Sequence, residues 1–373
     1  MTTGREAEVR TKLARSGEFL AGEGLDALVL RRRGPLAWIL DGADSHVRAD
    51  SEDACAFFAV LRDGTGILAA DAIEMPRLRA EELDDVPVAP LVHPWTTNGL
   101  EALLAELARR RAGRIASESL LPGVDPLGAD AAARFQALRL VLTPVERERL
   151  RALGLSAASA LEAAARAVRP GQREHEIAGA LEHNVRAIGA RAVVALVAGD
   201  QRIERFRHPI PTDQRVTRRA MLVLCAERHG LVVSATRLVG FQPLSGELAR
   251  RARAVAEVDA AALAATRPGA RLADVFAAIQ HAYAEQGFPD EWRFHHQGGI
   301  AGYAPREVVA TPTSPQLVAA GQAFAWNPSI TGTKSEDTIL LGDADVQVGT
   351  WTGTWPAHAT AAGPRPAEAT LEP

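Results

Sequence analysis

The sequence has little cysteine and little lysine, and each shortage limits what the protein can be. Its 373 residues include two cysteines, Cys55 and Cys225, which lie in different halves of the chain. Two distant cysteines make no disulfide framework, so we expect a protein of the reducing cytoplasm. Arginine and alanine are abundant at the expense of lysine, which we interpret as a consequence of genomic base composition.

Long apolar runs are also missing. Residues 1–8 lack the apolar stretch of a secretion signal, and no later run reaches the roughly 18 residues of a membrane-spanning helix. The net charge of −4 gives no reason to expect nucleic acid or an anionic membrane as a partner. A hydrophobic fraction of 47% and a charged fraction of 24% are typical of soluble globular proteins.

The chain length suggests two domains, the first ending at residue 142. Apolar residues recur with a helical period over residues 5–24 and 100–111, and the apolar runs 25–30 and 35–40 are typical of buried strands. Segments 56–61 and 65–70, joined by a turn at Asp63 and Gly64, are expected to form a β-hairpin. Alternating helices and strands predict a small α/β domain.

The rest of the chain shows one pattern twice. Thr143 and Pro144 have the residue types of a helix start. Predicted helices 146–168 and 174–188 are separated by an Arg-Pro-Gly turn, and a second Arg-Pro-Gly separates a helix ending at Thr266 from a helix at 272–286. Each pair precedes β-rich sequence, so we expect an internal duplication with a cleft between its halves. The tail, rich in Ala, Pro, Thr and Glu, is predicted to be flexible over residues 357–373.

Polar residues concentrate in the otherwise apolar stretch 294–340. His295 and His296 precede a glycine-rich turn, where missing side chains let the backbone pass close to a ligand. Two β-rich segments follow, one ending at Asn327 and one carrying Glu336 beside a second carboxylate. Polar groups in apolar strands are costly to bury unless they are paired. We therefore predict the functional site here.

These residues resemble a known family. Residues 143–356 resemble the pita-bread enzymes, which include creatinase, aminopeptidase P, prolidase and methionine aminopeptidase, and residues 1–142 resemble the small N-terminal domain of creatinase and aminopeptidase P. The resemblance implies an α/β (α+β) fold with a pseudo-twofold duplication, and a hydrolase of C–N bonds. It rests on the helix start at 169–177, the turn at His208, Ser234-Ala235-Thr236-Arg237, the glycine-rich segment 298–307 and Ser335-Glu336-Asp337-Thr338.

The resemblance also implies places for two metal ions, and here this sequence departs from the pattern. Peptidases of the family hold their metals with two aspartates, one histidine and two glutamates. The matching residues in this chain are Cys225, Ala235, Gly299, Asn327 and Glu336. One carboxylate cannot hold a pair of hard divalent ions, which require several oxygen or imidazole ligands. We therefore expect no metal cofactor.

Creatinase, by the same resemblance, works without metal and uses a histidine as a proton shuttle. The matching residue is His208, and His295 matches the second functional histidine of the family. An imidazole with a pKa of about 6.5 can accept and return a proton at neutral pH. The predicted catalytic residues are therefore His208, His295 and Glu336. The predicted substrate-binding residues are Asn327, Tyr303, Arg306 and His296.

Several of these residues have a plainer interpretation as well. Arg306 can anchor a substrate carboxylate or pair with its neighbour Glu307. His296 follows His295 in an extended segment, where neighbouring side chains point to opposite faces. Cys225 lies in an apolar strand and is expected to be buried and inert. Arg237 is expected to be structural.

Three functions remain open. The first is a metal-independent hydrolase of a small amide, amidine or guanidino compound, although Asn327 and Gly299 depart from creatinase. The second is an Xaa-Pro aminopeptidase with a single ion on His208, His295 and Glu336. The third is a non-catalytic pita-bread binding protein. By analogy with the family we also expect a homodimer, with the polar loop 44–48 facing the site of the partner.

Overall fold

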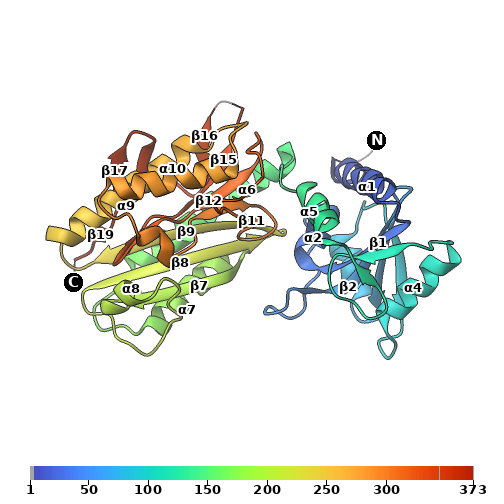
Figure 1. Cartoon of the computed structure of the whole chain (residues 1–373). Coiled ribbons are helices and arrows are strands. Elements are labelled where there is room, and N and C mark those ends of the chain that lie inside the picture. The colour runs from blue at the N-terminus through green and yellow to red at the C-terminus, as the bar shows by residue number, and fades with distance from the viewer. Residues whose placement is uncertain (1–3, 344, 373) are drawn as a thin grey trace. The chain divides into compact units, whose positions relative to one another are not determined.

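The computed structural model describes residues 4–343 and 345–372 (Figure 1). The chain divides into two compact units, Met1–Arg139 and Leu140–Pro373. The sequence predicts this boundary at residue 142. Helices and strands occur together in both units, which confirms the predicted α/β class. Within the described residues, no helix is both long and apolar enough to cross a membrane.

The first unit is a six-stranded sheet with helices packed on it, in the strand order β4-β3-β2-β1-β5-β6. Its core joins Val29 of the sheet to the apolar face of one helix, which carries Leu100, Leu103 and Leu107. The elements are α1 (Gly4–Glu23), β1 (Ala27–Arg32), α2 (Arg33–Ile39), β2 (Asp53–Leu61), β3 (Gly66–Asp71), α3 (Met75–Arg77), η1 (Leu78–Glu82), β4 (Ala89–His93), α4 (Gly99–Arg109), β5 (Ile115–Ser117), β6 (Asp125–Pro126) and α5 (Ala129–Ala137).

Most predicted elements of this unit are confirmed, and one is wrong. Strands β2 and β3 form the expected antiparallel hairpin, with Gly64 at a φ of 77° in its turn. Residues 35–40, predicted as a strand, lie mostly in helix α2. All side chains from Pro35 to Ile39 are buried, so hydrophobicity carries no period there that could separate helix from strand. The proline fits because it lies in the first turn of the helix.

The loop 44–48 is held within its own unit. The backbone N–H of Asp44 donates to Glu82, and the imidazole of His46 contacts the carboxylate of Asp44. That this loop faces the site of a partner stays a prediction.

Among its described residues, the second unit contains two larger sheets, in the strand orders β19-β9-β8-β7 and β11-β10-β12-β15-β16, and two two-stranded sheets, β13-β14 and β17-β18. Its helices are α6 (Pro144–Arg166), α7 (Glu174–Ala187), α8 (Gln201–Arg205), α9 (Gly246–Ala265), α10 (Leu272–Glu285) and the 3₁₀ helix η2 (Glu291–Phe294). Its strands are β7 (Arg191–Gly199), β8 (Arg219–Arg228), β9 (Leu231–Gly240), β10 (Gly298–Ala301), β11 (Val308–Val309), β12 (Ala323–Trp326), β13 (Ser329–Ile330), β14 (Thr333–Lys334), β15 (Asp337–Leu341), β16 (Val346–Val348), β17 (Ala357–Thr360), β18 (Gly363–Pro366) and β19 (Ala369–Thr370).

The predicted duplication is visible in the order of these elements. Helices α6 and α7 precede strands β7 to β9, and helices α9 and α10 precede strands β10, β12 and β15. In Figure 1, α9 and α10 lie above the strands as drawn and α7 lies below them. The first helix starts as expected, because the Thr143 hydroxyl accepts from the N–H of Glu146 in a capping box.

The two larger sheets meet where β9 runs beside β15. The N–H of Thr236 donates to the carbonyl of Glu336 at 3.1 Å, and the N–H of Ser234 donates to Oγ1 of Thr338 at 2.7 Å. Strands β8 and β9 are buried along almost their whole length. Polar side chains from the two halves of the unit therefore meet in the interior.

The C-terminal segment is not the flexible tail that the sequence predicts. Strands β17 and β18 form a hairpin, and β19 pairs in parallel with β9. Arg365 is fully buried and donates to Asp259, while Glu368 accepts three hydrogen bonds from Arg219. A composition rich in Ala and Pro resembles that of disordered chains, but these few polar anchors tie the segment to the unit.

Candidate active site

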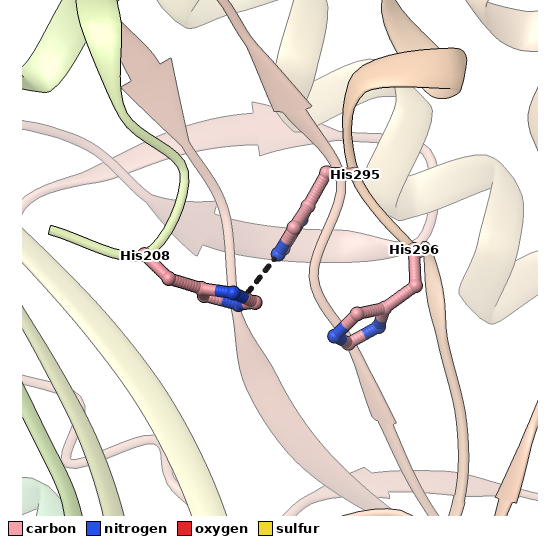
Figure 2. Close-up of side chains that lie close together, drawn as sticks. All are labelled: His208, His295 and His296. Atoms are coloured by element: carbon pink, nitrogen blue, oxygen red, sulfur yellow. Dashed lines mark hydrogen bonds between the residues drawn. The ribbon is translucent and has the colours of Figure 1, made fainter.

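Three histidines meet in the second unit. His208 lies in the loop after α8, and His295 and His296 follow η2. The Nε2 atoms of His208 and His295 are 3.0 Å apart, and one ring nitrogen from each histidine lies within 4.8 Å of the others. Figure 2 shows His208 and His295 directed toward each other, with His296 beside them. The structure therefore joins a turn from one half of the unit to a segment from the other half.

Two polar anchors bring these segments together. Arg207, the neighbour of His208, donates to Glu291 of η2 at 2.6 Å, so the turn is tied to the helix that precedes His295. The amide of Gln297 is fully buried, where it donates to the carbonyl of His295 and accepts from the Tyr283 hydroxyl at 2.9 Å. These hydrogen bonds hold the backbone on both sides of the histidine pair.

The expectation that His296 points away from His295 is wrong. Their ring centroids are 4.6 Å apart, and the ring of His296 is 5.9 Å from that of His208. The alternation of side chains holds only in a regular strand, and β10 begins two residues later at Gly298. His296 therefore joins the cluster.

All three imidazoles are held in the neutral form at physiological pH. Burial is the largest cause that lowers the pKa of His295 to about 2 and that of His296 to about 4. The positive charge of Lys334 contributes to both shifts, and that of Arg306 contributes to the shift of His296. The pKa of the more exposed His208 is lowered by burial and by the same two charges. With both rings neutral, the contact between His208 and His295 requires one nitrogen to donate and the other to accept.

Glu336 lies beside this cluster, and both of its oxygens are engaged. Oε2 contacts Lys334 Nζ at 2.7 Å and accepts from the Thr236 hydroxyl at 2.6 Å, while Oε1 accepts from Arg306 at 3.0 Å. Burial alone would raise the pKa of Glu336, but the charges of Lys334 and Arg306 outweigh it and lower the pKa to about 2. The side chain is an anion held between two cations.

The other predicted binding residues differ in what they contact. Arg306 pairs with Glu336 and not with Glu307, and it also donates to the Ser234 hydroxyl at 3.1 Å. Asn327 is 2% exposed, and its Oδ1 has no hydrogen-bond partner among the described residues. The Tyr303 hydroxyl donates to Glu146 at 2.6 Å, and Glu146 is the acidic residue of the capping box of α6.

Cys225 and Arg237 are buried, as expected for structural residues. The Cys225 thiol lies 3.2 Å from the Ser234 hydroxyl, and burial raises the pKa of the thiol. Arg237 donates to Glu162, to Asp337 and to a backbone carbonyl. Neither residue belongs to the histidine cluster.

The glycines of the turn allow neighbouring strands to pack closely. Gly298 and Gly299 have φ values of 105° and 153°, which residues with a side chain rarely adopt. A Cβ atom on Gly299 would overlap the carbonyl oxygen of Val308 on the neighbouring strand. The missing side chains thus allow close strand packing, where the sequence predicts room for a ligand.

Lys334 is the residue that sequence reasoning missed. It lies in β14, its side chain is 4% exposed, and its charge acts on all three histidines. A signal was present in the sequence, because 42 residues are Lys or Arg and Lys12 and Lys334 are the only two lysines. Scarcity of a residue type makes each remaining example informative.

Comparisons with known proteins agree with this fold. The model of metallopeptidase family M24 matches residues 148–344. No curated protein matches the sequence. An Xaa-Pro dipeptidase from Bacillus anthracis has a similar structure, with a TM-score of 0.77 and 17% identity over 92% of this chain and 97% of that chain. The dipeptidase PepE from Mycobacterium ulcerans gives a TM-score of 0.76 at 18% identity, covering 98% of each chain.

One further similar structure is not named as a peptidase. The N-terminal domain of FACT complex subunit SPT16 from Cicer arietinum gives a TM-score of 0.69 at 13% identity, covering 93% of this chain and 97% of that chain. At such identities the likeness shows the fold alone. Function has to be argued from the site.

The side chains at the matching positions do not fit a pair of divalent metal ions. They offer a neutral thiol, two positions without donor atoms, one amide and the carboxylate of Glu336. Both oxygens of this carboxylate are already bonded to buried cations. Hard ions require several anionic or carbonyl oxygens, and two fixed positive charges nearby oppose them.

Proposed function

This chain belongs to metallopeptidase family M24, a hydrolase family, and from that premise we propose that it hydrolyses a C–N bond of a small amide, amidine or guanidino compound without metal. His208 is the proton shuttle. The observation that supports this proposal is the 3.0 Å contact between two imidazoles whose pKa values are both lowered. A neutral imidazole is the form that can take a proton from water.

The chemistry divides between the two rings. His295 is buried and stays neutral, so it orients His208 through the shared hydrogen bond. His208 is exposed enough to reach a bound substrate and an attacking water. Its lowered pKa makes the protonated form a stronger acid, which suits return of the proton to a leaving nitrogen.

The reaction follows in two steps. Water attacks the carbon of the amide or amidine group, a C–O bond forms, and His208 takes the proton of the water. The C–N bond then breaks with its electron pair on nitrogen, and His208 returns the proton to that nitrogen. Asn327 and Arg306 are the groups we propose to bind the substrate, because each has a buried polar atom without a partner among the described residues.

The test is hydrolysis of a panel of Xaa-Pro dipeptides, N-acyl amino acids, amidines and guanidino acids, before and after treatment with a chelator. We expect hydrolysis of at least one compound, at a rate that treatment with the chelator does not change. His208→Ala should lower kcat/KM by about a hundredfold to ten-thousandfold. The matched control is His281→Ala, because His281 has a side chain that is 75% exposed and lies outside the site.

Two results would contradict this proposal. One is a folded protein that turns over no compound of the panel, which would favour a binding protein. The other is full activity in His208→Ala. A homodimer and a cytoplasmic location remain expectations, and sedimentation tests the first of them.

A second candidate function is a peptidase with one metal ion. The observation that favours it is that the three histidines each offer a nitrogen within 4.8 Å of the others. Three imidazoles are a known ligand set for zinc, which would supply Lewis-acid activation of water. Glu336, part of the ligand set expected from the sequence, is bonded to Lys334 and Arg306, and His296 takes its place.

Metal content separates the two candidates. The first predicts that the purified protein keeps no ion after incubation with excess manganese, cobalt and zinc. The second predicts about one zinc per chain, lost in His296→Ala. Under the first function the same substitution changes KM and leaves metal content unchanged.

A further inference from the structure

The charges around the histidine cluster do not balance. Lys334 and Glu336 are ionised groups that act on the pKa values of all three histidines, and Arg306 acts on those of His208 and His296. Two of these groups are positive and one is negative, and the histidines are neutral. The side chains of Lys334, Arg306 and Glu336 are 4%, 9% and 2% exposed. An excess positive charge that is this deeply buried is costly unless an anion accompanies it.

One of the two cations also has a donor that lacks an acceptor. The Nε atom of Arg306 is buried and has no hydrogen-bond partner among the described residues, although its two terminal nitrogens donate to Glu336 and Ser234. A guanidinium has donors only, so the missing partner has to be an acceptor. An oxyanion supplies such an acceptor together with the missing negative charge.

The rarity of lysine supports a specific role for Lys334. The chain uses arginine for nearly all of its 42 basic residues, and both remaining lysines are buried in ion pairs. An ammonium is a compact point charge that fits where a planar guanidinium does not. Of the two lysines, Lys334 is the one that acts on the three histidines.

We propose that Lys334 and Arg306 make this cluster a binding site for a small oxyanion, a carboxylate or a phosphate group. The positive charge of Lys334 makes the site select an anion over a neutral ligand. The proposal shares the site of the proposed hydrolase but concerns binding alone. It holds whether or not bond cleavage follows.

The experiment is a titration of the folded full-length chain with sodium acetate, with sodium phosphate and with acetamide, at constant ionic strength. Acetamide has the shape of acetate without its charge. Binding is followed through the imidazole resonances of protein labelled at histidine. We expect saturable shifts at His208, His295 and His296 with acetate or phosphate and none with acetamide. A response to acetate alone indicates a carboxylate ligand, and a response to phosphate alone indicates a phosphate ligand.

Two substitutions with opposite expected signs test the role of charge. Lys334→Met keeps the length of the side chain without its charge and should weaken oxyanion binding by about tenfold to a hundredfold. Glu336→Gln removes the opposing negative charge and should strengthen it. Arg218→Met removes one positive charge from a side chain that is 68% exposed, and should change nothing.

A purely structural role for these residues would weaken binding in both site variants, and that result would overturn the proposal. Saturable binding of zinc to the wild-type chain without binding of acetate or phosphate would overturn it too. If Lys334→Met does not fold, the gain expected for Glu336→Gln still decides the question. Hydrolysis is not measured in this experiment, so its outcome is independent of the proposed function.

Discussion

Glu336 and Asp337 are adjacent carboxylates, and the structure uses them in two different regions of the second unit. Glu336 contacts Lys334, Arg306 and the Thr236 hydroxyl beside the histidine cluster. Asp337 accepts from Arg237 at 3.1 Å and from the Thr350 hydroxyl at 2.7 Å. One carboxylate faces the candidate site, and the other belongs to the scaffold.

The two regions differ in how completely the donors of their buried cations are used. In the scaffold, fully buried Arg237 lies between Glu162 and Asp337, and its three guanidinium nitrogens all donate hydrogen bonds. In the site, the positive charges exceed the negative one and the Nε of Arg306 has no acceptor among the described residues. A buried cation whose nitrogens all donate stabilises a fold, whereas a cation with an unused donor leaves that group available to a ligand. Buried charge alone therefore does not identify a functional site, and the two regions are distinguished by the unused donor of Arg306.

The largest expected effect is a loss of stability when the buried scaffold cation is removed. Arg237→Leu leaves Glu162 and Asp337 buried without their cation, and should lower the free energy of unfolding by about 3–5 kcal/mol. Chemical unfolding followed by tryptophan fluorescence measures this. Arg306→Leu should cost clearly less, because Glu336 keeps Lys334 and Thr236. Equal losses in the two variants would remove the distinction between the regions.

A smaller effect is expected from pH. The folded pKa values of His295 and His296, about 2 and about 4, lie below the unfolded value of about 6.5, so the unfolded chain binds protons first as pH falls. Their stabilising contribution is complete above about pH 6.5 and is lost below it. Burial raises the pKa of Asp259 to about 6, so between that value and its ordinary pKa the folded chain binds one proton more than the unfolded chain at this residue. This contribution has the opposite sign to that of the histidines.

These three groups give a net difference of one proton, which corresponds to a loss of about 1.4 kcal/mol per pH unit between about pH 6 and 4.5. The lowered pKa values of His208 and His358 add to this loss. Urea unfolding at several pH values measures the slope. His295→Gln should lower this slope by about 1.4 kcal/mol per pH unit, while His281→Gln should leave it as in the wild type. A slope that His295→Gln does not change would show that the site histidines do not carry this pH dependence.

Tyr303 sharpens the comparison, because the sequence predicts it in the site and its hydroxyl contacts the scaffold. Tyr303→Phe removes the hydrogen bond to buried Glu146 and should lower the free energy of unfolding by about 1–2 kcal/mol. Its kcat/KM should stay within about twofold of the wild type. A large fall in kcat/KM without loss of stability would show that Tyr303 is a substrate-binding residue.

The smallest effect on stability is expected at His208. The side chain is exposed, so His208→Gln should change the free energy of unfolding by less than about 0.5 kcal/mol while abolishing proton transfer. Chemical unfolding and the hydrolysis assay together measure this. A variant that loses both stability and activity would identify His208 as a scaffold residue.

Part of the candidate site could be predicted from the sequence by position alone. The sequence predicts that His208 and His295 act together, and their rings are in contact. The orientation of His296 and the partner of Arg306 could not be predicted, because both depend on irregular backbone after η2 and β10. Nor could the strands of the C-terminal segment, whose anchor Arg365 finds its carboxylate more than a hundred residues earlier.

The sequence by itself determined the helices, the hairpin and the repeated helix pairs, because periodicity, capping and turn formation act between near neighbours in the chain. Only the tertiary structure decided which charges meet. Lys334 and Glu336 are neighbours in the chain, but Arg306 lies 30 residues earlier, and its pairing with Glu336 depends on the strands that bring the two segments together. Electrostatic interactions act through space, so the sign of the charge in the site is a property of the folded chain.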